Sequence, residues 1–133
     1  MTVATPKILQ RKDFDILSIY LRDDGLVNID IKSDEEITVS HVKLIVHALQ
    51  EMGGGKIFPL LITVGERTLP SEEARRYIAL AESDPYASAE AYVISSLSQK
   101  LVGNFYLRFN KPARPTRIFT NTNEAIEWLK TFQ

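Results

Sequence analysis

The sequence predicts a single α/β domain in which helices pack on a mixed β-sheet. The chain has 133 residues, of which 44% are hydrophobic and 25% charged. These values are typical of one globular domain and exclude a disordered chain or a rod. Segments rich in β-formers alternate with segments of helical periodicity, and strand–helix–strand connections make neighbouring strands parallel. We expect one domain over residues 1–133, with residues 1–14 as a flexible N-terminal arm.

The first two strands are predicted to form a hairpin. Residues 16–22 and 26–31 are rich in β-forming side chains, and the Asp-Asp-Gly sequence at 23–25 supplies the positive φ that a tight turn needs. Four apolar residues within 42–49 then recur at the helical spacing i, i+3, i+4 and i+7. The glycines at 53–55 end this helix because glycine tolerates the left-handed conformation.

The next segments alternate strand with helix. Residues 59–64 are continuously apolar except for one threonine, as in a strand that is covered on both faces. Ser71 is a predicted N-cap, and it precedes two glutamates and the apolar spacing of residues 74–81. Residues 89–94 follow as another strand.

A third helix is predicted from residue 95 or 96 to Phe109, and Pro112 lies just beyond its end. Residues 116–120 form a short fifth strand, after which Asn121 begins the last helix as its N-cap. The predicted order is therefore β-β-α-β-α-β-α-β-α. The first strand of the hairpin is expected to be an antiparallel edge of the sheet.

Several kinds of chemistry are excluded by the residue types. The chain has no cysteine, which removes disulfides, thiolate nucleophiles and zinc–thiolate or iron–sulfur sites. His41 and His47 lie six residues apart, at a spacing that does not bring them to one metal on a helix. The glycines before Lys56 follow a helix, whereas a phosphate-binding loop follows a strand. We therefore expect no metal, no cofactor and no catalytic residues, and interpret the chain as a non-enzyme.

Membrane insertion is not expected either. The longest apolar run without a charge, residues 57–65, is far shorter than the roughly 20 residues that cross a bilayer. The N-terminal residues lack the apolar core of a signal peptide. A cytoplasmic location is the expectation.

The third predicted helix carries the strongest candidate binding surface. Val102, Phe105, Tyr106 and Phe109 share one face at 100° per residue, and we expect this face to pack on the sheet. The opposite face combines cations with leucines, which gain burial only if a partner covers them. No acidic residue occurs between 91 and 123. The candidate partner- or anion-binding residues are Leu97, Lys100, Asn104, Leu107, Arg108, Lys111, Arg114 and Arg117.

The occupant of this surface is left open by the residues. A protein partner or a second copy of the chain, giving a homodimer, would cover the leucines and attract the cations. A small anionic ligand oriented by Asn104, Arg108 and Arg114 is the alternative, and pairing of the cations with acidic groups of the same fold or across a dimer is another. Nucleic acid is disfavoured because the net charge is −1 and no helix-turn-helix or ribonucleoprotein-type aromatic motif is present.

The order of elements resembles the STAS-like (SpoIIAA-like) fold of bacterial anti-sigma-factor antagonists, which share a broad shape with Sec14-type lipid carriers. Residues 91–119, which begin Ala-Tyr-Val-Ile-Ser-Ser-Leu, and Glu-Ala-Ile-Glu-Trp-Leu at 124–129 are similar to an uncharacterised bacterial family of small STAS-like proteins. The resemblance implies a regulatory domain that acts through protein–protein contact. Its alternative implication is a binder of a small anionic or amphipathic ligand in a Sec14/STAS-like site.

The resemblance also draws attention to Ser71. Antagonists of this family are phosphorylated on a serine or threonine at the start of the second helix, within an Asp-Ser-Ser/Thr-Gly pattern. Residues 68–74 read Thr-Leu-Pro-Ser-Glu-Glu-Ala, so Ser71 keeps a hydroxyl while the aspartate and the glycine are missing. A phosphate here would gain from the helix dipole but would face Glu72 and Glu73. Ser71 is interpreted first as an N-cap and second as a candidate phosphorylation site.

Overall fold

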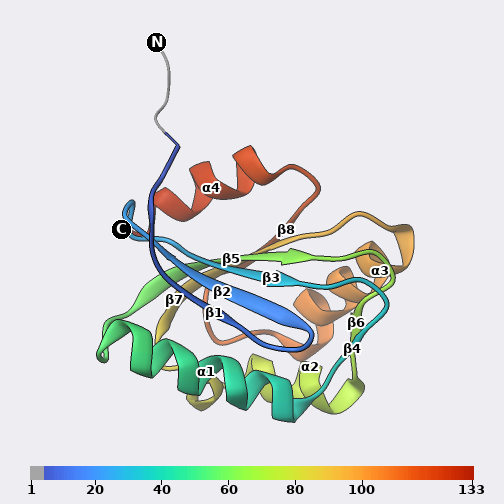
Figure 1. The fold of residues 1–133 in the computed structure, drawn as a ribbon. Helices are drawn as coiled ribbons and strands as arrows, with labels where there is room; N and C mark the ends of the chain where they lie inside the picture. The colour runs from blue at the N-terminus through green and yellow to red at the C-terminus, as the bar shows by residue number, and fades with distance from the viewer. Residues whose placement is uncertain (1–4) are drawn as a thin grey trace.

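The computed structural model describes residues 5–133, in which a six-stranded sheet carries helices on both faces (Figure 1). In sheet order the strands are β1 (Ile8–Asp13), β2 (Leu17–Arg22), β3 (Val27–Ile31), β5 (Phe58–Val64), β7 (Ala87–Val93) and β8 (Thr116–Phe119). The α-helices of this range are α1 (Val39–Gly53), α2 (Glu72–Ala79), α3 (Leu97–Phe105) and α4 (Thr122–Lys130). The smaller elements are the paired strands β4 (Glu36–Ile37) and β6 (Leu69–Pro70), a 3-10 turn η1 (Ala81–Ser83) and a π-helical turn η2 (Tyr106–Asn110).

The sheet is mixed, as predicted. Strands β1, β2 and β3 are antiparallel, whereas β3, β5, β7 and β8 are parallel. Each parallel connection contains a helix, because α1, α2 and α3 lie in turn between these four strands along the chain. The α/β class and the order of the nine predicted elements are confirmed.

The N-terminal segment differs from the prediction of a flexible arm over residues 1–14. Residues 8–13 form the edge strand β1, in which Lys12 lies opposite Ile19 of β2, while residues 1–4 lie outside the described residues. Five of the six side chains of β1 are exposed, so the strand needs no alternation of apolar and polar residues and shows none. The strand is held by backbone hydrogen bonds to β2, and a search for hydrophobic patterns does not detect such bonds. The edge of the sheet is therefore β1 and not β2.

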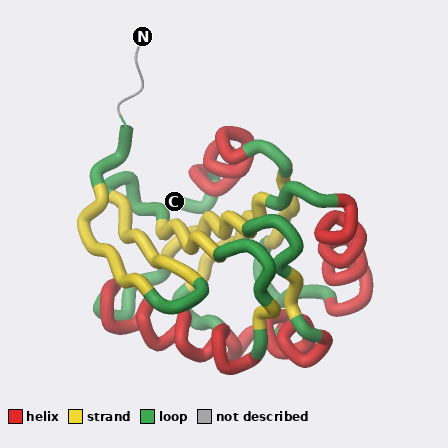
Figure 2. The backbone as a smooth tube through the Cα atoms, turned by 45° about the vertical axis from the view of Figure 1, so that its right-hand side comes forward, coloured by secondary structure: helices red, strands yellow, loops and turns green. Residues whose placement is uncertain are grey.

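Two apolar layers form the core, one on each face of the sheet. Leu60 and Ile62 of β5 belong to the layer beneath α1, whereas Leu61 between them belongs to the layer beneath α4. This alternation follows from the period of two in a strand. Figure 2 shows α4 on one side of the strands and α1 and α2 on the other. The α4 layer consists of Leu26, Leu61, Ala89, Ala91, Phe119, Ala125 and Leu129.

Helix α3 packs with a different face from the predicted one. Tyr106 is buried and Val102 half-buried as expected, but Phe105 and Phe109 are 47% and 62% exposed. The inward positions also include Gln99, whose side-chain amide donates to the carbonyl oxygens of Gly65 and Thr68 at 2.8 and 2.9 Å. A glutamine thus takes an interior position that hydrophobicity assigns to phenylalanine.

Gly103 completes the inward face of α3. A Cβ atom at this position would collide with the end of the Ile118 side chain of β8. The glycine therefore lets the helix lie directly against the strand. This close approach fixes the rotation of α3 about its axis and leaves the two phenylalanines on its outer side.

Candidate functional site

Helix α3 and the following turn η2 expose a row of four large apolar side chains, which we call the apolar row. Leu97 is 72% exposed and Leu101 63% exposed, and they continue at the same spacing of four residues into Phe105 and Phe109. The rings of the two phenylalanines are in contact in a tilted arrangement, with their centroids 4.7 Å apart. Contiguous exposed apolar side chains of this size mark interaction surfaces more often than isolated ones do.

Cations border the apolar row. Lys100, Arg108 and Lys111 are exposed, and within residues 5–133 none of them forms an ion pair with a carboxylate. The guanidinium carbon of Arg108 lies 5.4 Å from the ring centroid of Phe109, a distance at which a cation interacts with an aromatic face. The charges are thus available to an external partner, and one of them lies against the row itself.

A shallow groove accompanies the row where α2 and α3 meet. It has a volume of about 260 Å³ and is lined by Arg75, Leu101, Val102 and Phe105. The guanidinium of Arg75 lies over the ring of Phe105, 5.6 Å from its centroid, and donates to the carbonyl oxygen of Pro70 at 3.2 Å. The groove therefore combines an apolar floor with one cation from the neighbouring helix.

The structure brings together five of the eight residues predicted for partner or anion binding. Leu97, Lys100, Asn104, Arg108 and Lys111 are all exposed on the outer side of α3 and η2. Their function as a binding surface stays a prediction.

The remaining three predicted residues lie elsewhere. Leu107 is half-buried. Arg117 belongs to β8 and lies over the rings of Phe119 and Trp128. These two rings belong to the α4 side of the sheet, so Arg117 lies on that side too. Arg114 is buried. The sequence could not separate these positions from the row, because all three lie within the same acid-free stretch.

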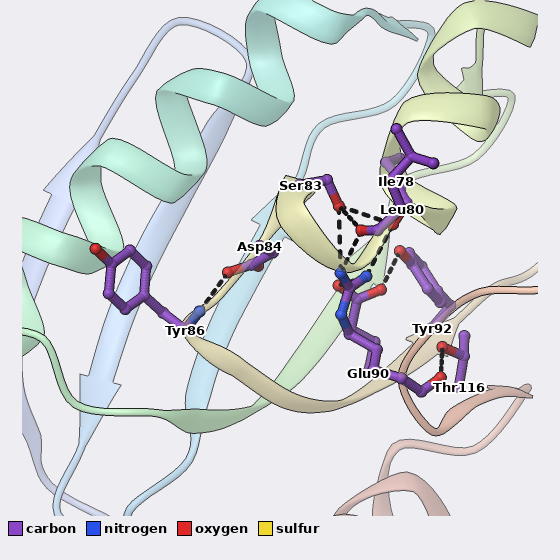
Figure 3. A network of polar contacts seen from close by, with 9 residues as sticks. Ile78, Leu80, Ser83, Asp84, Tyr86, Glu90, Tyr92 and Thr116 are labelled. Carbon is purple, nitrogen blue, oxygen red and sulfur yellow. Dashed lines mark hydrogen bonds and ion pairs between the residues drawn. The ribbon is translucent and has the colours of Figure 1, made fainter.

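Arg114 is the centre of a buried polar network instead of a surface cation. Figure 3 shows Ser83, Glu90 and Tyr92 of this network. Its guanidinium donates to the carbonyl oxygens of Ile78 and Leu80 at 2.8 and 2.9 Å, at the C-terminal end of α2. It also reaches the hydroxyl of Ser83 at 3.2 Å and the carboxylate of Glu90 at 3.4 Å. The expected surface position of Arg114 is wrong, because the residue is buried and both terminal nitrogens of its guanidinium bond to oxygens of the protein.

Glu90 is the least expected member of this network. It lies in the middle of β7 and is buried, and the hydroxyl of Tyr92 donates to its carboxylate at 2.8 Å. Burial raises the pKa of Glu90 from 4.5 to about 7, although Arg114 and Tyr92 act in the opposite direction. Burial also raises the pKa of the neighbouring Asp84. The site therefore holds a carboxyl group whose charge changes near neutral pH.

Sequence reasoning missed three exposed members of the row and the buried glutamate. Leu101, Phe105 and Phe109 continue from Leu97 at intervals of four. The two phenylalanines were expected on the sheet side, and Leu101 was not among the predicted residues. Glu90 stands between two alanines in a strand expected to be covered by helices. A charge at such a place indicates a buried partner, and that partner is Arg114.

Ser71 has the structural role predicted for it. Its hydroxyl oxygen accepts a hydrogen bond from the backbone N–H of Ala74 at 3.1 Å, which confirms the N-cap of α2. Glu72 and Glu73 are exposed in the first turn. Phosphorylation of Ser71 stays a prediction.

Two further observations concern the described part of the chain. Residues 5–133 contain no group of three or more His, Cys, Asp or Glu side chains that could hold a metal ion. No helix within this range has both the length and the apolar character needed to cross a membrane.

Comparison with solved structures identifies the fold. The chain is similar to the crystal structure of an uncharacterised protein of the DUF3478 family with a SpoIIAA-like fold, from Shewanella loihica PV-4. The TM-score is 0.53 and the sequence identity 16%, over 97% of this chain and 98% of that chain. The SpoIIAA-like fold expected from the sequence is thereby confirmed. A search of curated proteins finds no match. The family defined by a domain of unknown function (DUF7793) matches residues 19–133, and the chain belongs to this family.

Proposed function

We propose that this chain is a non-enzymatic, cytoplasmic regulatory domain that binds a protein partner through the apolar row of α3 and η2. The observation that carries the proposal is the exposure of Leu97, Leu101, Phe105 and Phe109 in one continuous row. Full burial of one such side chain contributes about 1.5–3 kcal/mol. A partner that covers the row would recover this free energy, which the isolated domain leaves unused.

Charge indicates the chemistry of the partner. Lys100, Arg108 and Lys111 border the row without carboxylate partners in residues 5–133. A partner segment with apolar side chains and flanking aspartates or glutamates would complement both features. An amphipathic helix of this composition fits a row with a spacing of four residues and an adjoining groove.

A different protein suits this surface better than a second copy of the chain. An isologous dimer would place the same patch against itself, so the cations beside the row would face their own copies. A membrane surface would cover the leucines too, but a groove lined by Arg75 and Phe105 matches a protruding side chain more closely than a flat lipid surface. The homodimer predicted from the sequence is therefore treated as an outcome of the test.

A small anionic ligand receives less support. Of the three residues predicted to orient it, Asn104 and Arg108 are exposed on α3, but Arg114 is buried and already bonded to protein oxygens. Without Arg114, the predicted set has no buried donor that would fix the orientation of a head group.

The proposal can be tested with a displayed library of random peptides. Peptides that bind the full chain should combine acidic with apolar residues, and the selected peptides are then titrated against variants. We expect Leu101→Glu to weaken binding at least tenfold, since burial of one leucine exceeds the roughly 1.4 kcal/mol that corresponds to a factor of ten. The double variant Lys100→Glu, Arg108→Glu should weaken the same peptides and favour basic ones.

Ile57→Glu is the matched control, because Ile57 is equally exposed but lies in the connection between α1 and β5. It should leave peptide binding unchanged, and equal losses in Ile57→Glu and Leu101→Glu would contradict the proposal. A wild-type dimer in sedimentation that Leu101→Glu dissociates would assign the row to a second copy. Flotation with anionic vesicles that Leu101→Glu abolishes would assign it to a membrane. Either result would overturn the proposed partner.

A further inference from the structure

A cavity of about 130 Å³, partly open to the surface, lies between the sheet and helices α1, α2 and α3. Most of its wall is apolar and comes from every surrounding element, with Ile45 of α1, Ile62 of β5, Ile78 of α2 and Val102 of α3 among the lining residues. Protein interiors are normally close-packed and contain few voids larger than a water molecule. A largely apolar cavity of this size is therefore a feature of the fold that needs an explanation.

Part of the cavity wall is polar. Glu90, Tyr92 and Tyr106 line it, and the rings of the two tyrosines meet edge to face with centroids 6.4 Å apart. The hydroxyl of Tyr92 is used by Glu90. The hydroxyl of Tyr106 is inaccessible to solvent and has no hydrogen-bond partner, in a residue that is only 6% exposed. Buried hydroxyl groups are nearly always bonded, so a ligand in the cavity that this hydroxyl reaches by a small rotation of the ring would supply the missing partner.

We propose that this cavity is a binding site for a small neutral molecule of about the size of one benzene ring that carries a single hydroxyl group. An engineered apolar cavity of about 150 Å³ is known to hold benzene, so the volume is sufficient for a phenol-sized ligand. The ring would contact the apolar wall, and its hydroxyl would bond to the Tyr106 hydroxyl. A charged ligand is disfavoured because most of the wall is apolar and would not replace its hydration.

Water is a poor alternative occupant. A buried water requires two to four polar partners, whereas polar side chains of the wall such as Thr68, Glu90 and Gln99 already bond to other groups of the protein. A molecule that is apolar on most of its surface and polar at one point matches both parts of the cavity.

The route into the cavity passes between α2 and α3. Arg75 and Val102 line both the cavity and the surface groove beside the apolar row. The Arg75 side chain lies across this boundary, over the ring of Phe105. Entry from this side would require the movement of one flexible side chain at most, and not of the sheet.

The inference concerns the interior of the domain and does not depend on the proposed partner. It is tested by titrating the full chain, labelled at its isoleucine and valine methyl groups, with phenol and with benzene while methyl NMR signals are recorded. We expect the signals of Ile45, Ile62 and Val102 to shift with both probes. Phenol should bind about tenfold more tightly, the ratio that corresponds to one hydrogen bond of ordinary strength.

Tyr106→Phe removes the hydroxyl and keeps the ring, so phenol should lose its advantage while benzene binding is unchanged. Tyr77→Phe is the matched control, because Tyr77 lies on α2 and does not line the cavity; it should keep the advantage of phenol. Val102→Phe, which fills the cavity, should abolish binding of both probes. Absence of methyl shifts at the cavity, or equal affinities for phenol and benzene in the wild type, would overturn the inference. An unchanged advantage of phenol in Tyr106→Phe would overturn the role of the hydroxyl.

Discussion

Glu90 should make the stability of this fold depend on pH, and Glu90→Gln should remove that dependence. The carboxyl group is buried in β7, and burial raises its pKa from 4.5 to about 7. Arg114 and Tyr92 favour the ionised form but do not outweigh the loss of water around the carboxyl. The folded protein therefore keeps the proton over a pH range in which the unfolded chain has lost it.

The sign and the size of the effect follow from this difference. Below the unfolded pKa both states carry the proton, so the contribution of Glu90 to stability is fully present. Between pH 4.5 and about 7 only the unfolded state ionises, and the free energy of unfolding falls as the pH rises. A shift of this size corresponds to about 3 kcal/mol, at 1.36 kcal/mol per pKa unit, once the pH exceeds the folded value.

Urea denaturation of the wild type and of Glu90→Gln, at intervals from about pH 4 to about pH 8, measures this contribution. Other groups whose pKa is shifted by folding are present in both proteins. The pKa of Asp84 is raised by burial, whereas that of Asp34 is lowered by its bond to Arg67. Their effects largely cancel in the difference between the two curves. From the low to the high end of this pH range, the free energy of unfolding of the wild type should fall by about 3 kcal/mol relative to that of the variant. Two parallel curves would refute the reasoning.

Three further substitutions probe the same scaffold by denaturation at neutral pH. Arg114→Met should destabilise the protein by about 2–4 kcal/mol, because two buried helix-end carbonyl groups lose a donor. Glu90 adds no unpaired charge, since without Arg114 it keeps its proton at neutral pH. An effect below about 1 kcal/mol would contradict the network. Gly65→Ala should cost about 1–3 kcal/mol, since its Cβ would collide with the backbone at Ser33, which cannot yield as a side chain can. Ser71→Ala should cost about 1 kcal/mol through loss of the N-cap, while Ser71→Asp, which retains an acceptor, should restore most of it.

The order of elements could be predicted because each element has a clear local signal. The run 59–64 has the continuous apolarity of a covered strand, and Ser71 and Asn121 have the side chains of N-caps, which both residues prove to be. Strand β1 has no such signal, because an exposed edge strand is held by backbone hydrogen bonds that any side chain permits. Local patterning therefore finds the covered strands and misses the uncovered one.

The candidate site was less accessible to sequence reasoning, for two physical reasons. Hydrophobicity assigned Phe105 to the interior of α3, but a helix buries the face that fits its neighbours, and here that face includes Gly103 against Ile118 and a fully bonded Gln99. The burial of Arg114 depends on a carboxylate 24 residues earlier in the chain. Such a long-range pairing arises only when the strands have been placed side by side.

Arg114 also links segments that would otherwise separate easily. Helix α2 has eight residues, too few to persist as an isolated helix in water. Its terminal carbonyl groups are held by a guanidinium from the connection that leads into β8, which is itself paired with β7. Fraying of α2 would leave the buried guanidinium without the carbonyl groups that accept its hydrogen bonds. The helix therefore opens only when this half of the sheet opens. A two-turn helix at the surface thereby shares the resistance to local unfolding of the central strands.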